Sequence, residues 1–509
     1  CITTFNYNSN MNKENKTVKI YNTPDKKRVP LIPHKENEIT MYSCGPTVYN
    51  TVHIGNLRSL VNFDVVSRAL RYLGYDLKRV VNFTDVGHMS SDSDFGEDKV
   101  ERQAVKEETD PISIANKYIS HVLESFRKLN VLNPNGTPIQ KDINVKDMTK
   151  ELWTQLGWAR ATDYISEMID FIKRIEANGH TYETEQAVYF DISTFPAYYE
   201  FFGQSLEEKQ VAVREEVKED QDKRNPADFV LWMKRYGKYK NHMMHWNSPW
   251  GDGFPGWHIE CSTMSCGLLG EYIDIHTGGS DLISVHHPNE VAQNWGAYGH
   301  YVIKYWIHNE FVYTSKGDKL SKSKNNAFTL QEIEQLGIPY MALRWYYLTS
   351  NYRTPMKFSI DSLKSSQSVY ENSVNRLAKE YNGKVGKPSE EYIQKFKDAL
   401  SDNFNTPVIL ALLNDLIKLN ISSEVKIATA LEFDKVLGLD LEQSITKGVT
   451  TKEIRFVKVK DKSVKEILRQ REIARKEKDW SKSDALRDQL AKMGYTVVDK
   501  EDGQYIVKK

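Results

Sequence analysis

A strand, a helix and a second strand follow one another between residues 38 and 86, and this succession limits the folds open to the chain. The segment EITMYSCGPTVY predicts a strand, and DLKRVVNFTDV predicts another. Between them, apolar residues recur at helical spacing from Leu57 to Leu73, and Gly74 is a typical helix stop. Such a parallel crossover places the loop after its first strand at the carboxyl end of a sheet, where open α/β sheets bind ligands.

The chain is long enough for several domains, because single hydrophobic cores stop growing well below 509 residues. The crossover unit predicts an α/β fold class with a parallel sheet. We expect an insertion to interrupt this sheet and DFVLW, residues 228–232, to resume it. Helical spacing over residues 360–440 indicates a bundle, and a charged linker near 441–462 then precedes a small terminal α/β module.

Two further segments have a clear local pattern. TDYISEMIDFIKRIEANG predicts an amphipathic helix that Thr162 caps and Gly179 stops, and QAVYFDI predicts a strand after it. The polar run GHMSSDSDFGEDKVERQA predicts a mobile loop that leads into a helix. The helix and the strand after it are expected to belong to the insertion between the two halves of the sheet.

Composition argues against a membrane or disulfide-rich protein. The chain has no run of 18 apolar residues, and its polar beginning lacks the apolar stretch of a signal peptide, with Met11 a possible natural start. Only four cysteines occur, which is typical of a reducing cytoplasm. The chain is neutral overall, but residues 451–509 hold 17 Lys and Arg against 11 Asp and Glu, a hint of a phosphate-rich partner that a solvated surface explains equally well.

Two short motifs lie far apart in the sequence. HIGN starts the first predicted helix, where His53 supplies a hydrogen-bonding group, Gly55 leaves the backbone open to a flat base or ribose, and the helix N-terminus favours phosphate. KLSKS places Lys319 and Lys322 three residues apart in a loop that can hold two ammonium groups on a leaving pyrophosphate. Alone, each has an ordinary alternative: a turn with a solvated histidine, and a solvated basic loop.

Cys44 lies nine residues before His53 and has three possible roles: a buried small hydrophobe, a nucleophile or a metal ligand. Downstream, Cys261 follows a tryptophan and a histidine, and His286 and Glu290 are four residues apart, with Pro288 suited to a helix first turn. Two cysteines, a histidine and a glutamate form a chemically reasonable zinc ligand set. No close Cys-x-x-Cys pair occurs, so the spacing alone does not establish a metal site. Taken one by one, the cysteines could be buried core thiols, the histidine could be hydrogen-bonded, and the glutamate could cap a helix.

Together, HIGN and KLSKS resemble the two signatures of class I aminoacyl-tRNA synthetases. YSCGPTVY, GWHIECS, HTGGSDL and HHPNE also resemble the cysteinyl-tRNA synthetase family, and the likeness covers the chain from about residue 17 to its end. The first signature usually ends in histidine, whereas Asn56 stands there, which weakens any role given to that position. The loop after residue 86 is also longer than the acidic segment of many family members.

The resemblance implies a role for each matching residue. The family's zinc ligands map onto Cys44, Cys261, His286 and Glu290, and its cysteine pocket onto Cys44, Thr84, Trp257 and His276. Catalysis is assigned to His53, Asn56, Lys319 and Lys322, and ATP binding to His53, Gly55, Asn56, Lys319, Ser321 and Lys322. The anticodon-reading positions match Arg475, Trp480, Asp484 and Asp499. Trp480 is also suited to anchoring a small core, and Ser481 with Asp484 to a helix-capping pair.

The implied enzyme is a cysteine–tRNA ligase with one Zn²⁺ per chain and Mg²⁺ carried with ATP. Its partners would be L-cysteine, ATP and tRNA(Cys), with no membrane, and it would be a cytoplasmic monomer. Zinc binds a thiolate better than a hydroxyl, so one metal contact would separate cysteine from serine without editing. Two rival activities are a ligase that passes activated cysteine to a small amine, as in mycothiol biosynthesis, and a catalytically silent paralogue that only binds nucleic acid.

The implied architecture is a Rossmann-like parallel-sheet catalytic domain with an inserted subdomain, followed by a helical bundle and a small C-terminal α/β anticodon-binding module. The expected segments are 1–17, a disordered extension; 18–135, the first half of the catalytic domain; 136–224, the connective insertion; 225–310, the second half; 311–362, the stem-contact region with the KLSKS loop; 363–445, the bundle; and 446–509, the linker and anticodon module.

Overall fold

The computed structural model describes residues 17–89, 96–203, 220–320, 327–447, 462–477, 479–500 and 503–508. The N-terminal extension expected to be disordered lies outside these residues up to position 16, and so does part of the polar loop after residue 86. Among the described helices, none is both long enough and apolar enough to cross a membrane.

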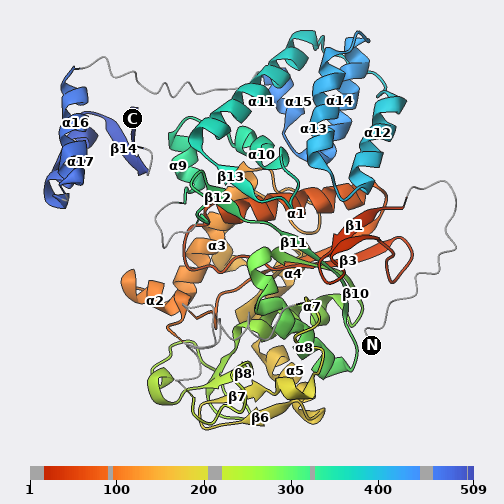
Figure 1. Ribbon diagram of the computed structural model, residues 1–509, viewed down its shortest axis with the longest axis vertical. Coiled ribbons are helices and arrows are strands. Elements are labelled where there is room, and N and C mark those ends of the chain that lie inside the picture. Colours follow the sequence, from red (N-terminus) through yellow and green to blue (C-terminus); the bar gives the residue numbers. More distant parts are fainter. Residues whose placement is uncertain are drawn as a thin grey trace.

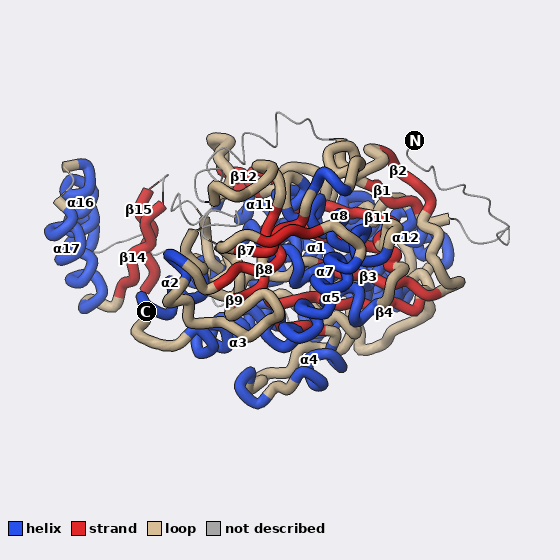
Figure 2. Tube along the Cα trace, turned by 90° about the horizontal axis from the view of Figure 1, so that it is seen from below, coloured by secondary structure: helices blue, strands red, loops and turns tan. Residues whose placement is uncertain are grey.

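A five-stranded parallel sheet forms the centre of the molecule (Figures 1 and 2). In spatial order, its strands are β11 (Ile303–Asn309), β10 (Ile273–Gly279), β3 (Glu38–Ser43), β4 (Asp76–Phe83) and β5 (Trp158–Arg160). Every neighbouring pair is parallel. The predicted α/β fold class with a parallel sheet is therefore confirmed.

The predicted crossover is also confirmed, because α1 (Ile54–Tyr72) connects β3 to its parallel neighbour β4. Gly74 adopts a positive φ of 97° just after the helix, as expected for a helix stop. Figure 1 shows α1 between the central strands and the bundle helices. Its Leu57 and Val61 are fully buried there.

The sheet separates two hydrophobic cores, and β3 contributes to both. Met41 packs into the core shared with α1 and the bundle, whereas its neighbour Tyr42 packs into the core on the other face. Alternate side chains of a strand point to opposite faces, so a strand buried on both faces is apolar at successive positions. The second core includes α5 (Ile165–Ala177), α7 (Trp257–Leu269) and α8 (His286–Tyr298).

The expectation that DFVLW resumes the central sheet is wrong. These residues lead into β8 (Phe229–Lys234), which pairs antiparallel with β7 (Ala187–Phe190) and β9 (Gly253–Pro255) in a separate four-stranded sheet completed by β6 (Thr181–Glu183). The central sheet resumes at β10. Both kinds of strand are buried apolar runs, which periodicity does not distinguish. Conversely, β5 lies within the expected insertion and belongs to the central sheet; the segment boundaries themselves stay predictions.

The predicted cap of α5 is wrong, although the helix, its Gly179 stop and the strand β7 after it are confirmed. The helix begins at Ile165, and Tyr164 rather than Thr162 is the N-cap residue. Thr162 instead donates its backbone N–H (2.9 Å) and its hydroxyl (2.7 Å) to Asp85 at the end of the central sheet. The carboxylate of Asp85, distant in the sequence, therefore takes the place of the local hydrogen bond by which Thr162 would have capped the helix.

The remaining elements surround this centre. They are β1 (Lys19–Asn22), β2 (Lys27–Pro30), α2 (Lys99–Lys106), α3 (Pro111–Lys128), α4 (Lys150–Leu156), β12 (Val312–Thr314), α9 (Leu330–Gln335), α10 (Tyr340–Leu348) and β13 (Met356–Phe358), followed by the bundle helices α11 (Ile360–Glu380), α12 (Glu390–Ser401), α13 (Thr406–Lys418), α14 (Ser423–Leu437) and α15 (Leu441–Lys447). The bundle is confirmed. Residues 441–447, at the start of the linker predicted near 441–462, form α15, which buries Leu441 and Ile445. The rest of that linker, residues 448–461, lies outside the described residues.

The C-terminal module has its own small core. Its described elements are α16 (Lys462–Lys476), α17 (Trp480–Lys492), β14 (Tyr495–Lys500) and β15 (Gly503–Lys508), with the strands paired antiparallel. Val464, Ile467, Leu490 and Tyr495 pack together between them. The predicted α/β character of this module is confirmed.

Candidate active site

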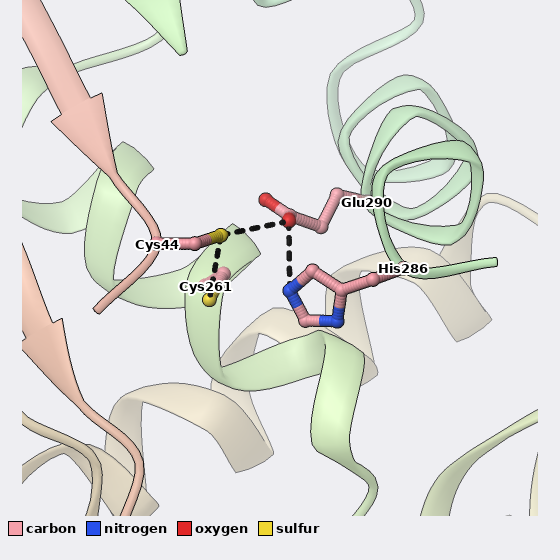
Figure 3. A group of neighbouring side chains, drawn as sticks. All are labelled: Cys44, Cys261, His286 and Glu290. Atoms are coloured by element: carbon pink, nitrogen blue, oxygen red, sulfur yellow. Dashed lines mark hydrogen bonds and ion pairs between the residues drawn. The ribbon is translucent and has the colours of Figure 1, made fainter. Parts of the chain in front are cut away.

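The four predicted metal ligands lie together at the carboxyl end of the central sheet. Cys44 directly follows β3, and its backbone N–H donates to Thr277 of the neighbouring strand β10 at 2.9 Å. Cys261 projects from α7, while His286 and Glu290 lie one turn apart at the start of α8. Their donor atoms are all within 4.8 Å of one another (Figure 3).

The spacing of these donors fits a tetrahedral metal ion. The sulfurs of Cys44 and Cys261 are 3.9 Å apart. Two thiolates held about 2.3 Å from one zinc in a tetrahedral site are about 3.8 Å apart. The Cys44 sulfur is 3.8 Å from Oε1 of Glu290, whose second carboxylate oxygen is buried without a hydrogen-bond partner in the described structure. The donor set and its geometry therefore fit zinc.

Charge in the cluster also favours a cation. Burial alone would keep Glu290 neutral, but His276 and His286 lower its pKa to about 2. Burial opposes the charge of His286 too, yet Glu290 and Cys261 raise its pKa to about 10. An imidazolium proton thus supplies positive charge between anionic donors. Metal binding to such a set releases the proton, because the metal takes over its electrostatic role.

His276, on β10, belongs to a second group of four close donors. Its Nε2 atom is 3.5 Å from the Cys44 sulfur and 3.4 Å from Glu290. His287 completes this group with Cys44 and Glu290. The sequence analysis missed His287, although the repeated histidine in HHPNE offered a signal. The group that contains both cysteines matches the sulfur preference of zinc better.

Trp257 and Thr84, predicted to contact the amino acid, flank this cluster. Trp257 begins α7, and its ring centroid is 4.3 Å from that of His286. Thr84 follows β4, is buried, and accepts a hydrogen bond from Asn82 at 3.0 Å. Its backbone pairs with the segment after Cys44, since Val48 donates to the Thr84 carbonyl at 3.0 Å. The structure therefore brings the Trp257 ring against His286 and pairs the Thr84 backbone with the segment after Cys44.

His53 forms the N-cap of α1. Its Nδ1 atom accepts hydrogen bonds from the backbone N–H groups of Gly55 (3.1 Å) and Asn56 (3.4 Å). A Cβ atom on Gly55 would lie 2.9 Å from the His53 ring and 3.9 Å from the Cβ of Leu320. A side chain at this position would press on the His53 ring, and glycine leaves that space free. The Asn56 side chain is exposed at the helix start.

Both described ends of the KLSKS loop lie against this helix start. Leu320 donates its backbone N–H to Val312 of β12, and the backbone N–H of Ile54 donates to the Phe328 carbonyl at 2.8 Å. The Lys319 ammonium lies 3.6 Å from the centre of the Phe311 ring. Ser321 and Lys322 are outside the described residues, so their assigned roles stay predictions. The fold nevertheless joins two motifs that lie far apart in the sequence.

Comparisons with known proteins agree with this site. Residues 30–368 match the family model for the tRNA synthetases class I (C) catalytic domain, and residues 461–506 match the cysteinyl-tRNA ligase anticodon binding domain. The cysteine–tRNA ligase of Treponema denticola is 36% identical over 95% of this chain and 98% of that protein. The chain belongs to the cysteine–tRNA ligase family.

Other comparisons support the same family and fold. The Deinococcus radiodurans cysteine–tRNA ligase is 35% identical over 96% of both chains. A solved structure of Mycobacterium tuberculosis methionyl-tRNA synthetase bound by methionyl-adenylate aligns with a TM-score of 0.51 at 14% identity, covering 81% of this chain and 92% of that one. This likeness shows the shared fold alone.

The anticodon-binding domain of this family member presents an exposed aromatic ring. Trp480 is 56% exposed, so the alternative that it anchors the core is wrong, and the Arg475 guanidinium lies 5.8 Å from its ring centre. The capping alternative for Asp484 is wrong as well, because Asp479 is the N-cap of α17 and accepts from Lys482. Asp484 is exposed and pairs with Arg487 at 3.3 Å. Asp499 lies on β14, and its side chain is not described.

Proposed function

We propose that this chain activates L-cysteine with ATP and transfers it to the terminal ribose of tRNA(Cys). The observation that carries the proposal is the cluster of Cys44, Cys261, His286 and Glu290 beside the His53 helix start. Family membership supports the activity, and the donor chemistry supports cysteine as the amino acid. We expect the protein to act as a cytoplasmic monomer.

The cluster is proposed to hold one zinc ion. Bound zinc would favour the substrate thiol, as thiolate, over the nearly isosteric hydroxyl of serine. The chain's own residues prepare this site: Cys44 and Cys261 direct their sulfurs at one another, and His258 meets His286 through their Nδ1 atoms at 2.8 Å, which fixes the imidazole orientation. Trp257, Thr84 and His276 would line the amino-acid pocket, and His276 contacts both Cys44 and Glu290.

No protein nucleophile is needed for either chemical step. The cysteine carboxylate attacks the α-phosphate of ATP, forming cysteinyl-adenylate and releasing pyrophosphate. A ribose hydroxyl of the tRNA then attacks the adenylate carbonyl and releases AMP. His53 and Asn56 at the α1 N-terminus would stabilise the α-phosphate, while Lys319 and Lys322 bind the outer phosphates with Mg²⁺ carried by ATP. Catalysis then consists of positioning and electrostatic stabilisation.

The test combines metal analysis with cysteine-dependent ATP–pyrophosphate exchange and charging of bulk tRNA. The purified protein should hold about one equivalent of zinc, and Cys261→Ser should lose both the metal and most cysteine affinity, since it replaces a thiolate ligand. Cys266→Ser is the matched control: this buried cysteine lies on the same helix but its sulfur faces Asn294 at 3.4 Å. Strong preference for cysteine over serine in metal-free protein would refute zinc selection.

The same assays separate the rival activities. Exchange without charging of tRNA would favour transfer to a small amine, and a complete lack of exchange would favour the binding-only paralogue. The anticodon-binding domain match supports tRNA as the acceptor.

A further inference from the structure

His88 lies at the base of the long loop after β4, next to the amino-acid pocket. The chain turns at Gly87, where φ is +70°, and a Cβ atom there would lie 2.6 Å from the carbonyl oxygen of Pro255. Only glycine allows this approach. Pro255 ends β9 two residues before Trp257, so the turn brings His88 directly beside the first residue of α7.

Hydrogen bonds fix both nitrogens of the His88 ring. Nε2 lies 2.7 Å from the ammonium nitrogen of Lys99, and Nδ1 lies 2.6 Å from the hydroxyl oxygen of Thr47. An ammonium group has only donors, so Lys99 donates to Nε2 and the ring proton is on Nδ1, which donates to Thr47. His88 and Lys99 are both buried. The ring therefore has one tautomer and one orientation.

The plane of this ring supports Trp257. The two rings stack with centroids 3.9 Å apart and planes 10° apart. Trp257 also contacts His286, whose ring centroid is 4.3 Å away and whose plane is tilted by 37°. The indole thus contacts both a histidine fixed by hydrogen bonds and a candidate metal ligand. Thr47, the hydrogen-bond acceptor, lies in the loop between Cys44 and His53 and bridges to Thr84.

We infer that His88 is a positioning residue of the amino-acid pocket, which holds the Trp257 ring against His286 by stacking on it. The inference rests on the proposed function and extends it to a residue outside the family signatures quoted above. A ring already held by two neighbouring rings loses little further freedom when the amino acid binds, so the ordering cost of binding is lowered. Loss of the stack should weaken cysteine binding without affecting ATP.

Three substitutions separate stacking from hydrogen bonding. His88→Ala removes both, and His88→Asn keeps a group able to bond Thr47 but removes the ring. His88→Phe keeps an aromatic ring for Trp257 but removes both hydrogen bonds. We expect the KM for cysteine in ATP–pyrophosphate exchange to rise about three- to tenfold in the alanine and asparagine variants, the contribution of one aromatic pair. The phenylalanine variant should stay within about twofold, even if its Tm falls.

Controls separate this inference from the proposed function. His121→Ala alters an exposed histidine on α3 and should leave both KM values unchanged. The KM for ATP and the zinc content should stay constant in all His88 variants. A phenylalanine variant as impaired as the alanine variant, or an unchanged KM for cysteine in both the alanine and asparagine variants, would overturn the inference. Failure of the unaltered protein to catalyse exchange would instead overturn the proposed function.

Discussion

Asp98 carries a buried carboxylate at the N-terminus of α2. Its Oδ1 caps the helix through Val100 (2.7 Å) and Glu101 (3.1 Å), while its Oδ2 is buried without a hydrogen-bond partner among the described residues. Burial raises the pKa of Asp98 to about 6, although the nearby His242 opposes the shift. A carboxyl group whose pKa is higher in the folded state than in the unfolded state binds its proton more tightly when folded.

The sign of the pH effect follows from this difference. The favourable contribution of Asp98 is fully present below its unfolded pKa of 3.8 and is lost as the pH rises through about 6. Asparagine caps helices as well as aspartate does, so Asp98→Asn should be more stable than the unaltered protein at pH 8 and similar to it near pH 4. Thermal denaturation across this range would check the prediction. A larger advantage at pH 4 than at pH 8 would contradict it.

The candidate metal ligands could be predicted from the sequence, whereas the residues that position the neighbouring side chains could not. Cys44, Cys261, His286 and Glu290 were predicted as one group, and their side chains lie together. His88 was not singled out, because its partners come from three separate segments and only the Gly87 turn brings it beside Trp257. Contacts of this kind depend on loop geometry that periodicity does not encode.

Helix α9 links the KLSKS loop to the start of α1. Thr329 and Glu332 form a capping box: the Thr329 hydroxyl accepts from the Glu332 N–H at 3.2 Å, and Glu332 accepts from the Thr329 N–H at 2.8 Å. The Thr329 backbone also bridges to His53. The cap of this helix therefore fixes the point where the loop returns to His53.

Removal of the cap should affect catalysis more than cysteine binding. Thr329→Ala is expected to weaken the helix start by about 1 kcal/mol. The freed loop end should lower kcat for ATP–pyrophosphate exchange while leaving the KM for cysteine unchanged. Thr149→Ala removes a threonine N-cap from α4, a helix away from the KLSKS loop, and should leave kcat unaltered. Equal effects of the two substitutions on kcat would refute a specific role of α9.

The elements themselves were predicted to different degrees. The crossover β3–α1–β4, helix α5 and the bundle were predictable from the spacing of apolar residues. This spacing is local in the sequence, and it is clearest in long amphipathic helices and buried strands. The membership of β8 and β5 in their sheets was not predictable, because strand pairing is set by partners distant in the sequence. The Thr162 cap failed for a similar reason: Asp85, far away in sequence, supplied a better acceptor.

At the scale of the whole molecule, amino-acid activation and tRNA recognition belong to separate parts of the chain. The exposed Trp480 ring lies near Arg475 in the C-terminal module. An aromatic ring that stacks an unpaired base contributes about 1–3 kcal/mol. Trp480→Ala should therefore raise the KM for tRNA about tenfold or more in charging assays and leave ATP–pyrophosphate exchange unchanged. Met493→Ala, which shortens another partly exposed apolar side chain of the module, is the control.

The KM for tRNA in charging assays tests this prediction. If Trp480→Ala left the KM for tRNA unaltered, the assignment of Trp480 to anticodon recognition would be wrong. If it impaired exchange as well, the two parts of the chain would not act independently.

The strand order of the central sheet also determines when the sheet can be completed during synthesis on the ribosome. Strand β3 lies between β4, which follows it closely in the chain, and β10, which is synthesised only after residue 272. The sheet therefore stays incomplete during much of translation, and the early segment exposes one edge of β3 together with the Cys44 thiol. His286 and Glu290 emerge later still, so the nascent chain acquires its complete donor set, and with it the ability to bind a metal ion, only after the ribosome has passed residue 290.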